Sequence, residues 1–343
     1  MKALLFHGLG NISIDEVPIP EIGDQEVLIK VRACAICATD LRIFRGEKNA
    51  KAGLILGHEF SGDIFKMGKE VRDLTVGDRV GVYPIIADGK CDYCIRGYRN
   101  RCVNRKTIGI EINGGFAEYI LIPADAVRLG HVMKLPQEIS YEEATLLEPL
   151  STVVNSTEKM DIGYGDGVLI IGAGPMGLMH VMLAKLRGAT SIIVSDMVDT
   201  RLEIARRLGA SHLINPNKMS LIDSLNELKS DYSVNKAILT IGIPGIVEQL
   251  LEVIQPQGRI SLFAGGGKTY LSNIDLNKIH YKEIILTATQ NATPEQFKKA
   301  LRLMASGYLN IKEIISHRFP LEKAIEAFSL RDELKALKVV LTP

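Results

Sequence analysis

A cysteine, a histidine and a glutamate have the side-chain types of a catalytic metal site. Cys37 begins the segment CATD, His58 is the centre of GHE, and Glu148 begins the segment EPL. A thiolate, an imidazole and a carboxylate form a complete set of protein ligands for a catalytic zinc ion, with one coordination position left for water or substrate. The three residues therefore predict a zinc ion that takes part in a reaction.

Each of these residues also has an ordinary structural explanation. Cys37 could be a small buried hydrophobic residue like its neighbour Cys34, and a single histidine is more often structural than metal-binding. Glu148 lies in the largely apolar stretch 144–150. A carboxylate buried there without a cation or a hydrogen-bond partner would be costly, which favours a role for it.

A glycine-rich turn near the middle of the chain has the spacing of a dinucleotide-binding site. The apolar run 168–171 predicts a buried parallel strand, and the glycines that follow it in G-x-G-x-x-G spacing are Gly172, Gly174 and Gly177. The first glycine allows a tight turn, the second lets the backbone approach a pyrophosphate, and the third lets the helix pack closely on the strand. Pro175 and Met176 open that helix, whose N-terminus favours phosphate anions.

The residues after the turn complete this unit. Apolar side chains at helical spacing predict a helix that ends near Gly188, and residues 191–195 predict a second strand that leads to Asp196. A carboxylate at this position can bind the ribose hydroxyls and repel a 2′-phosphate, so Asp196 favours NAD over NADP, although Arg201 follows closely. Because strand, helix, second strand and acidic residue all occur in order, the pattern favours a dinucleotide site over an ordinary glycine turn.

Three of the five cysteines lie close together with the spacing C-x2-C-x7-C; they are Cys91, Cys94 and Cys102. This clustering suits metal binding in a reducing compartment better than a disulfide framework.

Two kinds of pattern surround these residues. In the first 150 residues, short β-like runs such as 27–33, 79–83 and 116–122 are separated by Gly, Pro and Asp, which is typical of a compact, mostly antiparallel domain. From residue 168 onward strands alternate with helices, and strand 284–288 would complete six parallel strands in a doubly wound sheet. The turn Gly265-Gly266-Gly267 falls where the nicotinamide half of a cofactor is expected, or it is only a flexible loop.

Length and composition fit a two-domain enzyme. The chain has 343 residues, 46% hydrophobic residues and a net charge of +1. It has no basic block for nucleic acid and no apolar run of the roughly 18 residues that a membrane span needs. The N-terminal segment MKALLFHGLG lacks a signal-peptide pattern, so a cytoplasmic location is expected.

Taken together, these features resemble the zinc-containing medium-chain dehydrogenases, the superfamily of alcohol, sorbitol and threonine dehydrogenases. The resemblance covers essentially the whole chain and rests on GHEFSG with the following Gly68 and Val71, VGDRV at 76–80, the cysteine segment, GGFAEY at 114–119 and the GAGPMG turn. It implies an α/β fold in which a GroES-like, mostly β catalytic domain (residues 1–152 and 291–343) is interrupted by a Rossmann NAD-binding domain with a doubly wound parallel sheet (153–290). It also implies an active site in the crevice between the domains and a homodimer or homotetramer.

The resemblance assigns roles to individual residues. It implies that the catalytic zinc ligands are Cys37, His58, Glu59 and Glu148. In this assignment Glu59 binds zinc directly or in exchange with water. Asp40 matches the carboxylate that orients the metal-binding histidine, and Thr39 matches the hydroxyl that takes the alcohol proton.

By the same resemblance, the cysteine segment corresponds to a structural zinc lobe with four cysteines in C-x2-C-x2-C-x7-C spacing. Cys91, Cys94 and Cys102 match the last three positions, and Asp88 occupies the first. Because an aspartate oxygen is an acceptable zinc ligand, the lobe is predicted to hold a zinc ion that serves stability and assembly. The alternative is a lobe that has lost its metal.

The implied activity is hydride transfer from a secondary alcohol to NAD+ with zinc as Lewis acid. Glu148 and the segment HRFPLEKAIEAF look most like polyol and sugar-alcohol dehydrogenases. Sorbitol enzymes carry an Arg-Tyr pair where this chain has Thr289-Gln290 before Asn291, so L-threonine dehydrogenase is the alternative. Many members pass the proton on to a histidine at the position of Arg42, so the outer part of the relay is unassigned. The zinc ligands disfavour a non-catalytic nucleotide-binding relative and a zinc-free quinone-reductase-like enzyme.

Overall fold

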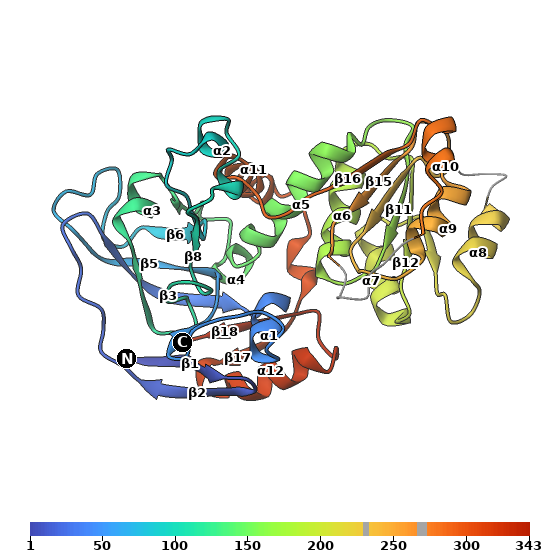
Figure 1. The fold of residues 1–343 in the computed structure, drawn as a ribbon. Helices are drawn as coiled ribbons and strands as arrows, with labels where there is room; N and C mark the ends of the chain where they lie inside the picture. The colour runs from blue at the N-terminus through green and yellow to red at the C-terminus, as the bar shows by residue number, and fades with distance from the viewer. Residues whose placement is uncertain (229–232, 266–272) are drawn as a thin grey trace. The chain divides into compact units, whose positions relative to one another are not determined.

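The structure is a computed structural model that describes residues 1–228, 233–265 and 273–343 (Figure 1). The chain divides into two compact units. The first unit contains residues 1–151, 292–307 and 311–343, and the second contains residues 152–291 and 308–310. The short segment 308–310 is thus grouped with the second unit, whereas the sequence placed it in the returning part of the first.

The first unit is mostly β, as predicted. Its strands are β1 (Lys2–Gly8), β2 (Asn11–Glu16), β3 (Val27–Ala35), β4 (Leu54–Ile55), β5 (Glu59–Met67), β6 (Arg79–Val82), β7 (Ile85–Ile86), β8 (Lys106–Thr107), β9 (Tyr119–Ile122), β10 (Val132–Lys134), β17 (Ile315–Pro320) and β18 (Lys338–Thr342). Its helices are α1 (Ala38–Phe44), α2 (Asp92–Ile95), α3 (Ala124–Arg128), α4 (Tyr141–Ala144), α11 (Pro294–Ala305) and α12 (Ala324–Asp332), with short 3-10 turns at Arg99–Arg101, Ile311–Ile314 and Leu321–Lys323. Helix α5 (Leu147–Met160) leads out of this unit.

A seven-stranded sheet organises this unit, in the order β10-β6-β5-β3-β18-β17 with β9 also paired to β3. Strand β3 runs antiparallel to β5, and Ala35 at its carboxyl end is opposite Glu59. It also runs antiparallel to β18, where Val340 is opposite Ala35. One end of the sheet therefore holds the residue that follows β3 together with the first residues of β5 and β18.

The second unit has the predicted doubly wound sheet. Its elements are β11 (Gly167–Ile171), α6 (Pro175–Leu186), β12 (Ser191–Ser195), α7 (Asp199–Leu208), β13 (His212–Ile214), α8 (Leu221–Leu228), β14 (Lys236–Leu239), α9 (Ile246–Val253), β15 (Arg259–Leu262), α10 (Leu276–Tyr281) and β16 (Ile285–Ala288). The order is β13-β12-β11-β14-β15-β16, and every pair is parallel. This confirms the six parallel strands. Helices α8 and α10 were not predicted.

The central strands of this sheet are apolar because helices cover them. Every residue of β11 and β12 is buried, and the core beside them contains Leu169, Ile193 and Leu239. Of the Gly265-Gly266-Gly267 turn, Gly265 is exposed, whereas Gly266 and Gly267 lie outside the described residues.

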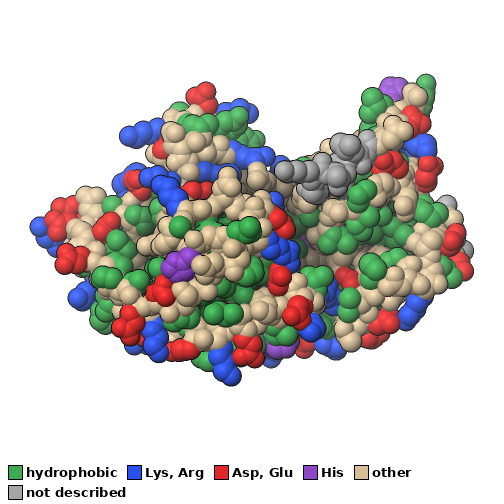
Figure 2. Space-filling view, turned by 60° about the horizontal axis from the view of Figure 1, so that its bottom comes forward, with side chains coloured by type: hydrophobic (Ala, Val, Ile, Leu, Met, Phe, Trp, Pro, Cys, Tyr) green, Lys and Arg blue, Asp and Glu red, His purple; other side chains and the backbone are tan. Residues whose placement is uncertain are grey.

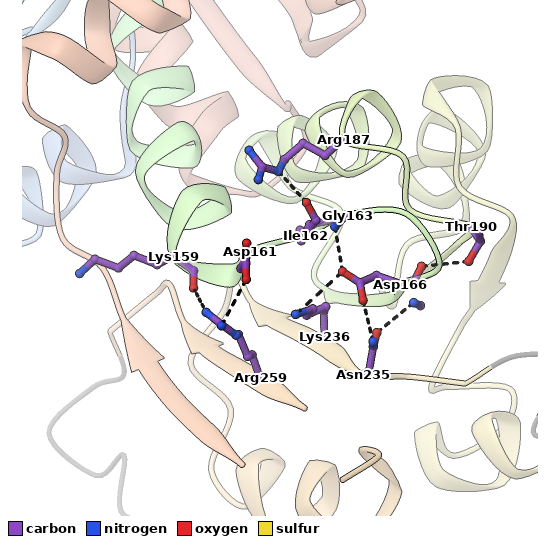
Figure 3. Close-up of polar contacts among 11 residues, drawn as sticks. Lys159, Asp161, Ile162, Gly163, Asp166, Arg187, Thr190, Asn235, Lys236 and Arg259 are labelled. Carbon is purple, nitrogen blue, oxygen red and sulfur yellow. Dashed lines mark hydrogen bonds and ion pairs between the residues drawn. The ribbon is translucent and has the colours of Figure 1, made fainter. Parts of the chain in front are cut away.

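A polar network fastens the beginnings of these strands (Figure 3). Asp166 accepts hydrogen bonds from the Gly163 backbone N–H at 2.8 Å and from the Asn235 side-chain amide at 2.6 Å. Asn235 in turn accepts one from the Gly167 N–H at 3.0 Å, and Lys236 Nζ lies 3.9 Å from the Asp166 carboxylate. The loop before β11 is thereby tied to the start of β14, at the ends of the strands opposite the glycine turn.

Acidic and basic side chains are interspersed over the face shown in Figure 2, in keeping with the small net charge. Within the described residues, no helix combines the length and the apolar character that crossing a membrane requires.

Candidate metal centre and dinucleotide site

The potential ligands of a catalytic metal meet where β3 ends and β5 begins. Cys37 follows β3 and precedes α1, His58 directly precedes β5, and Glu59 is its first residue. One ligand atom from each of the three lies within 4.8 Å of the others. His58 and Glu59 are buried, whereas Cys37 is half-buried, so the group is open to solvent on the side of Cys37.

Asp40 holds this group in place. Its Oδ2 accepts a hydrogen bond from the Cys37 N–H at 2.8 Å, and its Oδ1 lies 3.6 Å from His58 Nδ1. Since Nδ1 faces Asp40, Nε2 is the imidazole atom left for a metal. Burial by itself would lower the pKa of His58, but the charges of Cys37 and Asp40 outweigh it and raise the pKa well above its ordinary value. The negative charges around His58 therefore stabilise a positive charge at this point, whether it is a proton on the imidazole or a metal ion bound to it.

Lys338 is a member of the site that the sequence analysis missed. Its Nζ forms an ion pair with Glu59 Oε2, and the two side chains are almost completely buried. Burial would lower the pKa of Lys338, but the charge of Glu59 outweighs it and raises the pKa. A signal was available, because Lys338 is the one charged residue in the otherwise apolar run 336–341.

Glu148 lies in the first turn of α5 and is not part of the three-residue group. Burial raises the pKa of this carboxyl to about 7, while the charge of His58 lowers it and that of Glu59 raises it. Glu148 is thus close enough to His58 and Glu59 for their charges to change its pKa. Thr39, in the first turn of α1 beside Cys37, is half-buried, and Arg42 is exposed with its Nε 3.6 Å from Glu47.

The donor set fits zinc. Cys37 supplies sulfur, His58 nitrogen and Glu59 oxygen, the three ligand types that zinc accepts. The buried Glu59 Oε1 has no hydrogen-bond partner in the described part of the chain. A buried carboxylate oxygen without a partner is costly, and a cation at this point would remove that cost.

The cysteine lobe gathers a second group of four residues. One ligand atom from each of Asp88, Cys91, Cys94 and Cys102 lies within 4.8 Å of the others. The Asp88 Oδ1 accepts hydrogen bonds from the backbone N–H groups of Lys90 at 2.8 Å and Cys91 at 3.2 Å. These contacts, the Lys90 N–H above all, lower the pKa of Asp88, so it is anionic. Three sulfurs and a carboxylate make four donors, the number that structural zinc sites use.

The three glycines of the turn differ in the space around them. Gly172 has φ of +100°, which favours glycine, and a Cβ at Gly177 would lie 1.8 Å from the Gly172 carbonyl oxygen. A Cβ at Gly174, in contrast, would meet no heavy atom within 4 Å. The first and third glycines are therefore required by the protein itself, whereas the space at the second is open to a ligand. Pro175 and Met176 begin α6 at this point.

Asp196 is linked directly to this turn. It follows β12, and its Oδ2 accepts a hydrogen bond from the Ala173 N–H at 2.7 Å while its Oδ1 accepts one from the Val198 N–H at 2.9 Å. Both bonds fix the carboxylate beside the turn, where a ribose would follow the pyrophosphate. Arg201 lies in the first turns of α7, three residues after Val198.

Comparison with known proteins identifies the family. Residues 23–137 match the model of the alcohol dehydrogenase GroES-like domain, and residues 175–306 match that of the zinc-binding dehydrogenases. The chain is a zinc-containing medium-chain dehydrogenase. It is therefore an oxidoreductase of the zinc- and NAD-dependent type, and the resemblance seen in the sequence is confirmed.

This dehydrogenase is similar to enzymes of two substrate classes over nearly its whole length. It is 38% identical to an L-threonine 3-dehydrogenase of Pyrococcus horikoshii, covering 95% of this chain and 93% of that one. It is 32% identical to a sorbitol dehydrogenase of Bacillus subtilis, covering 100% and 97%. A solved structure of a zinc-binding dehydrogenase from Sinorhizobium meliloti, bound to NADP, matches with a TM-score of 0.93 at 30% identity and covers 100% of this chain and 99% of that one.

Proposed function

We propose that this dehydrogenase transfers a hydride from a secondary alcohol of the polyol or sugar-alcohol class to NAD+. The observation that carries the proposal is the metal group of one thiolate, one imidazole and one carboxylate with a second carboxylate, Glu148, close by. A site with a single thiolate and two carboxylates is harder than one with two thiolates, and harder ligands suit oxygen-rich substrates. Similarity to a sorbitol dehydrogenase supports the same class.

The proposed catalytic residues act on the proton and on the metal ligands. When bound, zinc supplies the Lewis acidity that lowers the pKa of the substrate hydroxyl, and NAD+ supplies the carbon that accepts the hydride. Thr39, which lies two residues after Cys37 and is half-buried, takes the hydroxyl proton in this proposal, as the family resemblance implies. Asp40 orients His58, and Glu59 and Glu148 supply carboxylates to the site. The zinc ligands in this proposal are Cys37, His58, Glu59 and Glu148.

The cofactor half of the proposal rests on the glycine turn and Asp196. The open space at Gly174 would take the pyrophosphate, and the fixed Asp196 carboxylate would bind the ribose hydroxyls of NAD. The Asp88 lobe is proposed to hold a structural zinc ion. A cytoplasmic location and a homodimeric or homotetrameric assembly remain predictions.

An L-threonine 3-dehydrogenase activity is the second candidate, since the similarity to the Pyrococcus horikoshii enzyme is the higher of the two. The test is an NAD-reduction assay of zinc-loaded protein with polyols, sugar phosphates, amino alcohols and simple secondary alcohols. Turnover that requires zinc and is greatest with a polyol supports the first proposal. Turnover confined to L-threonine selects the second, and no zinc-dependent turnover with any alcohol contradicts both.

A further inference from the structure

A threonine on the strand next to the glycine turn lies directly against the turn. Strand β14 runs parallel to β11, and Leu239 is opposite Ile171 at their carboxyl ends. The next residues of the two strands, Thr240 and Gly172, are therefore side by side, although they are 68 positions apart in the sequence. The Thr240 N–H continues the pairing, because it donates to the Ile171 carbonyl oxygen at 3.0 Å.

The Thr240 hydroxyl makes a further contact that the strand pairing does not require. Its Oγ1 lies 2.8 Å from the Ile171 carbonyl oxygen and 3.2 Å from the Gly172 carbonyl oxygen, so one hydroxyl proton serves two successive carbonyls. The fit is close as well, since a Cβ at Gly172 would lie 2.5 Å from Thr240 Oγ1. The hydroxyl thus binds the first glycine of the turn and fills the space beside it.

Strand β12, on the other side of β11, binds the N–H groups of the same turn. The Gly172 N–H donates to the Ser195 carbonyl oxygen at 2.7 Å, and the Ala173 N–H donates to Asp196 Oδ2 at 2.7 Å. The peptide group that joins Gly172 to Ala173 is therefore held by two side chains. Its oxygen accepts from Thr240, and its N–H donates to Asp196.

The orientation of this peptide decides what the turn presents to an anion. The Gly172 carbonyl oxygen faces Thr240 and the buried Gly177, where an added Cβ would lie 1.8 Å from it. The negative end of the peptide dipole is thus directed into the protein and not into the open space at Gly174. A carbonyl oxygen turned toward that space would repel a pyrophosphate.

We propose that Thr240 is a positioning residue for the dinucleotide, and that its hydroxyl, together with Asp196, holds the peptide between Gly172 and Ala173 in the orientation that admits the pyrophosphate. This inference rests on the dinucleotide site of the proposed function and adds a residue to it. Asp196 also has the ribose as a partner in that function, whereas Thr240 acts through the turn alone.

Thr240→Val tests the hydroxyl with little change in side-chain shape. The methyl group that replaces the hydroxyl loses the hydrogen bond, and it cannot lie 2.8 Å and 3.2 Å from two carbonyl oxygens without repulsion, so the peptide has to shift. The Kd of NADH, measured by the fluorescence of the bound nicotinamide, should rise about five- to tenfold. Thr240→Ser keeps the hydroxyl and should restore a Kd close to the native value.

Thr240→Ala is the second variant, because it removes the hydroxyl without placing a methyl group against the carbonyl oxygens. It leaves the Gly172 carbonyl without the hydroxyl donor and should raise the Kd of NADH at least about threefold. This variant keeps the inference testable if Thr240→Val does not fold.

Fragments of the cofactor show whether the effect passes through the turn. ADP-ribose contains the pyrophosphate and adenosine does not, and the Kd of each is measured by displacement of NADH. Thr240→Val should raise the Kd of ADP-ribose by the same factor as that of NADH, while the Kd of adenosine should stay within about twofold of the native value.

Thr190→Val is the matched control. The Thr190 hydroxyl also donates to a backbone carbonyl, that of Asp166 at 3.2 Å, but at the opposite ends of the strands (Figure 3). The same substitution there removes the same kind of bond far from the glycine turn. It should leave the Kd of NADH and of ADP-ribose unchanged.

Four results would overturn this inference and leave the dinucleotide site standing. They are an unchanged Kd of NADH in folded Thr240→Val or Thr240→Ala, equal losses of affinity for adenosine and ADP-ribose, a Thr240→Ser variant that binds no better than Thr240→Val, and an equal rise in Kd in Thr190→Val. Native protein that binds neither NADH nor ADP-ribose would instead contradict the proposed dinucleotide site itself.

Discussion

Lys338 and Glu59 form an ion pair in the interior of the first unit, with side chains that are 4% and 1% exposed. Glu59 Oε2 faces the ammonium, while its Oε1 has no hydrogen-bond partner in the described chain. One oxygen of the same carboxylate lies within 4.8 Å of ligand atoms of Cys37 and His58. Lys338 therefore positions a potential zinc ligand and would compete with a bound metal for the negative charge of Glu59. The pair offers a physical basis for a carboxylate that exchanges on and off the zinc.

Replacing Lys338 with Met should lower the stability of the metal-free protein and increase the stabilisation that zinc provides. Breaking one side of a buried ion pair typically costs about 3 to 5 kcal/mol, because the remaining charge is left uncompensated. Zinc would supply the missing positive charge, so the rise in Tm on adding zinc should be larger in Lys338→Met than in the native enzyme. Lys338→Arg keeps the charge and serves as control. An unchanged metal-free Tm would show that the pair contributes nothing.

Most of the site could be predicted from sequence because its residues stand in local motifs. The glycine turn, Asp196 and the Cys37 and His58 segments each carry their spacing within a few residues, and the alternation of strands and helices predicted the parallel sheet. Lys338 was missed because it reaches Glu59 only through the pairing of β18 with β3, which brings together residues far apart in the sequence.

Removing the charge of Asp196 should change cofactor choice. The native enzyme is expected to prefer NAD, because the carboxylate repels a 2′-phosphate. Asp196→Asn keeps an acceptor for the Ala173 N–H, and Asp196→Ala removes it. Both variants should narrow or reverse the ratio of kcat/KM for NAD over NADP, and Asp196→Ala should raise KM for NAD further. A native enzyme that uses the two cofactors equally would contradict the assignment.

Metal content tests the lobe of Asp88, Cys91, Cys94 and Cys102. If both groups bind zinc, purified protein should contain two zinc ions per chain by elemental analysis. Cys94→Ser should lower that number to one and reduce Tm, since a structural zinc contributes directly to folding, while kcat per catalytic zinc stays nearly unchanged. Native protein that holds one zinc and tolerates Cys94→Ser without loss of Tm would show that the lobe is empty.

The Asp166 network should contribute to stability alone. Asp166→Ala leaves the Asn235 amide and the Gly163 N–H without their acceptor (Figure 3). Each unpaired group should lower the free energy of unfolding by no more than about 1 to 3 kcal/mol. The expected result is a lower Tm with an unchanged Kd for NAD, because the glycine turn lies at the other ends of the strands. Asp223→Ala, in the exposed first turn of α8, is a control. Loss of NAD affinity at a temperature where the variant is folded would show coupling across the sheet.

Glu148 is the remaining potential zinc ligand, and its position explains why its role has to be tested by kinetics. The three other donors lie within 4.8 Å of one another without it, yet the charges of His58 and Glu59 act on its buried carboxyl. Such a carboxylate can approach the metal or leave room for water. A metal left open in this way can accept a substrate through two adjacent oxygens.

Vicinal diols and 1,2-substituted secondary alcohols should therefore be better substrates than simple primary alcohols, by at least about tenfold in kcat/KM, or about 1.4 kcal/mol in transition-state binding. Glu148→Cys should erode this ratio, because a thiolate binds zinc more firmly and would close the position that the second oxygen needs. Glu148→Gln should lower kcat while Tm and the Kd for NAD stay the same, since the amide is nearly isosteric and removes only the charge. Ethanol or propanol oxidised as well as any diol, or a Glu148→Gln variant with native kcat, would show that Glu148 serves the fold and not the reaction.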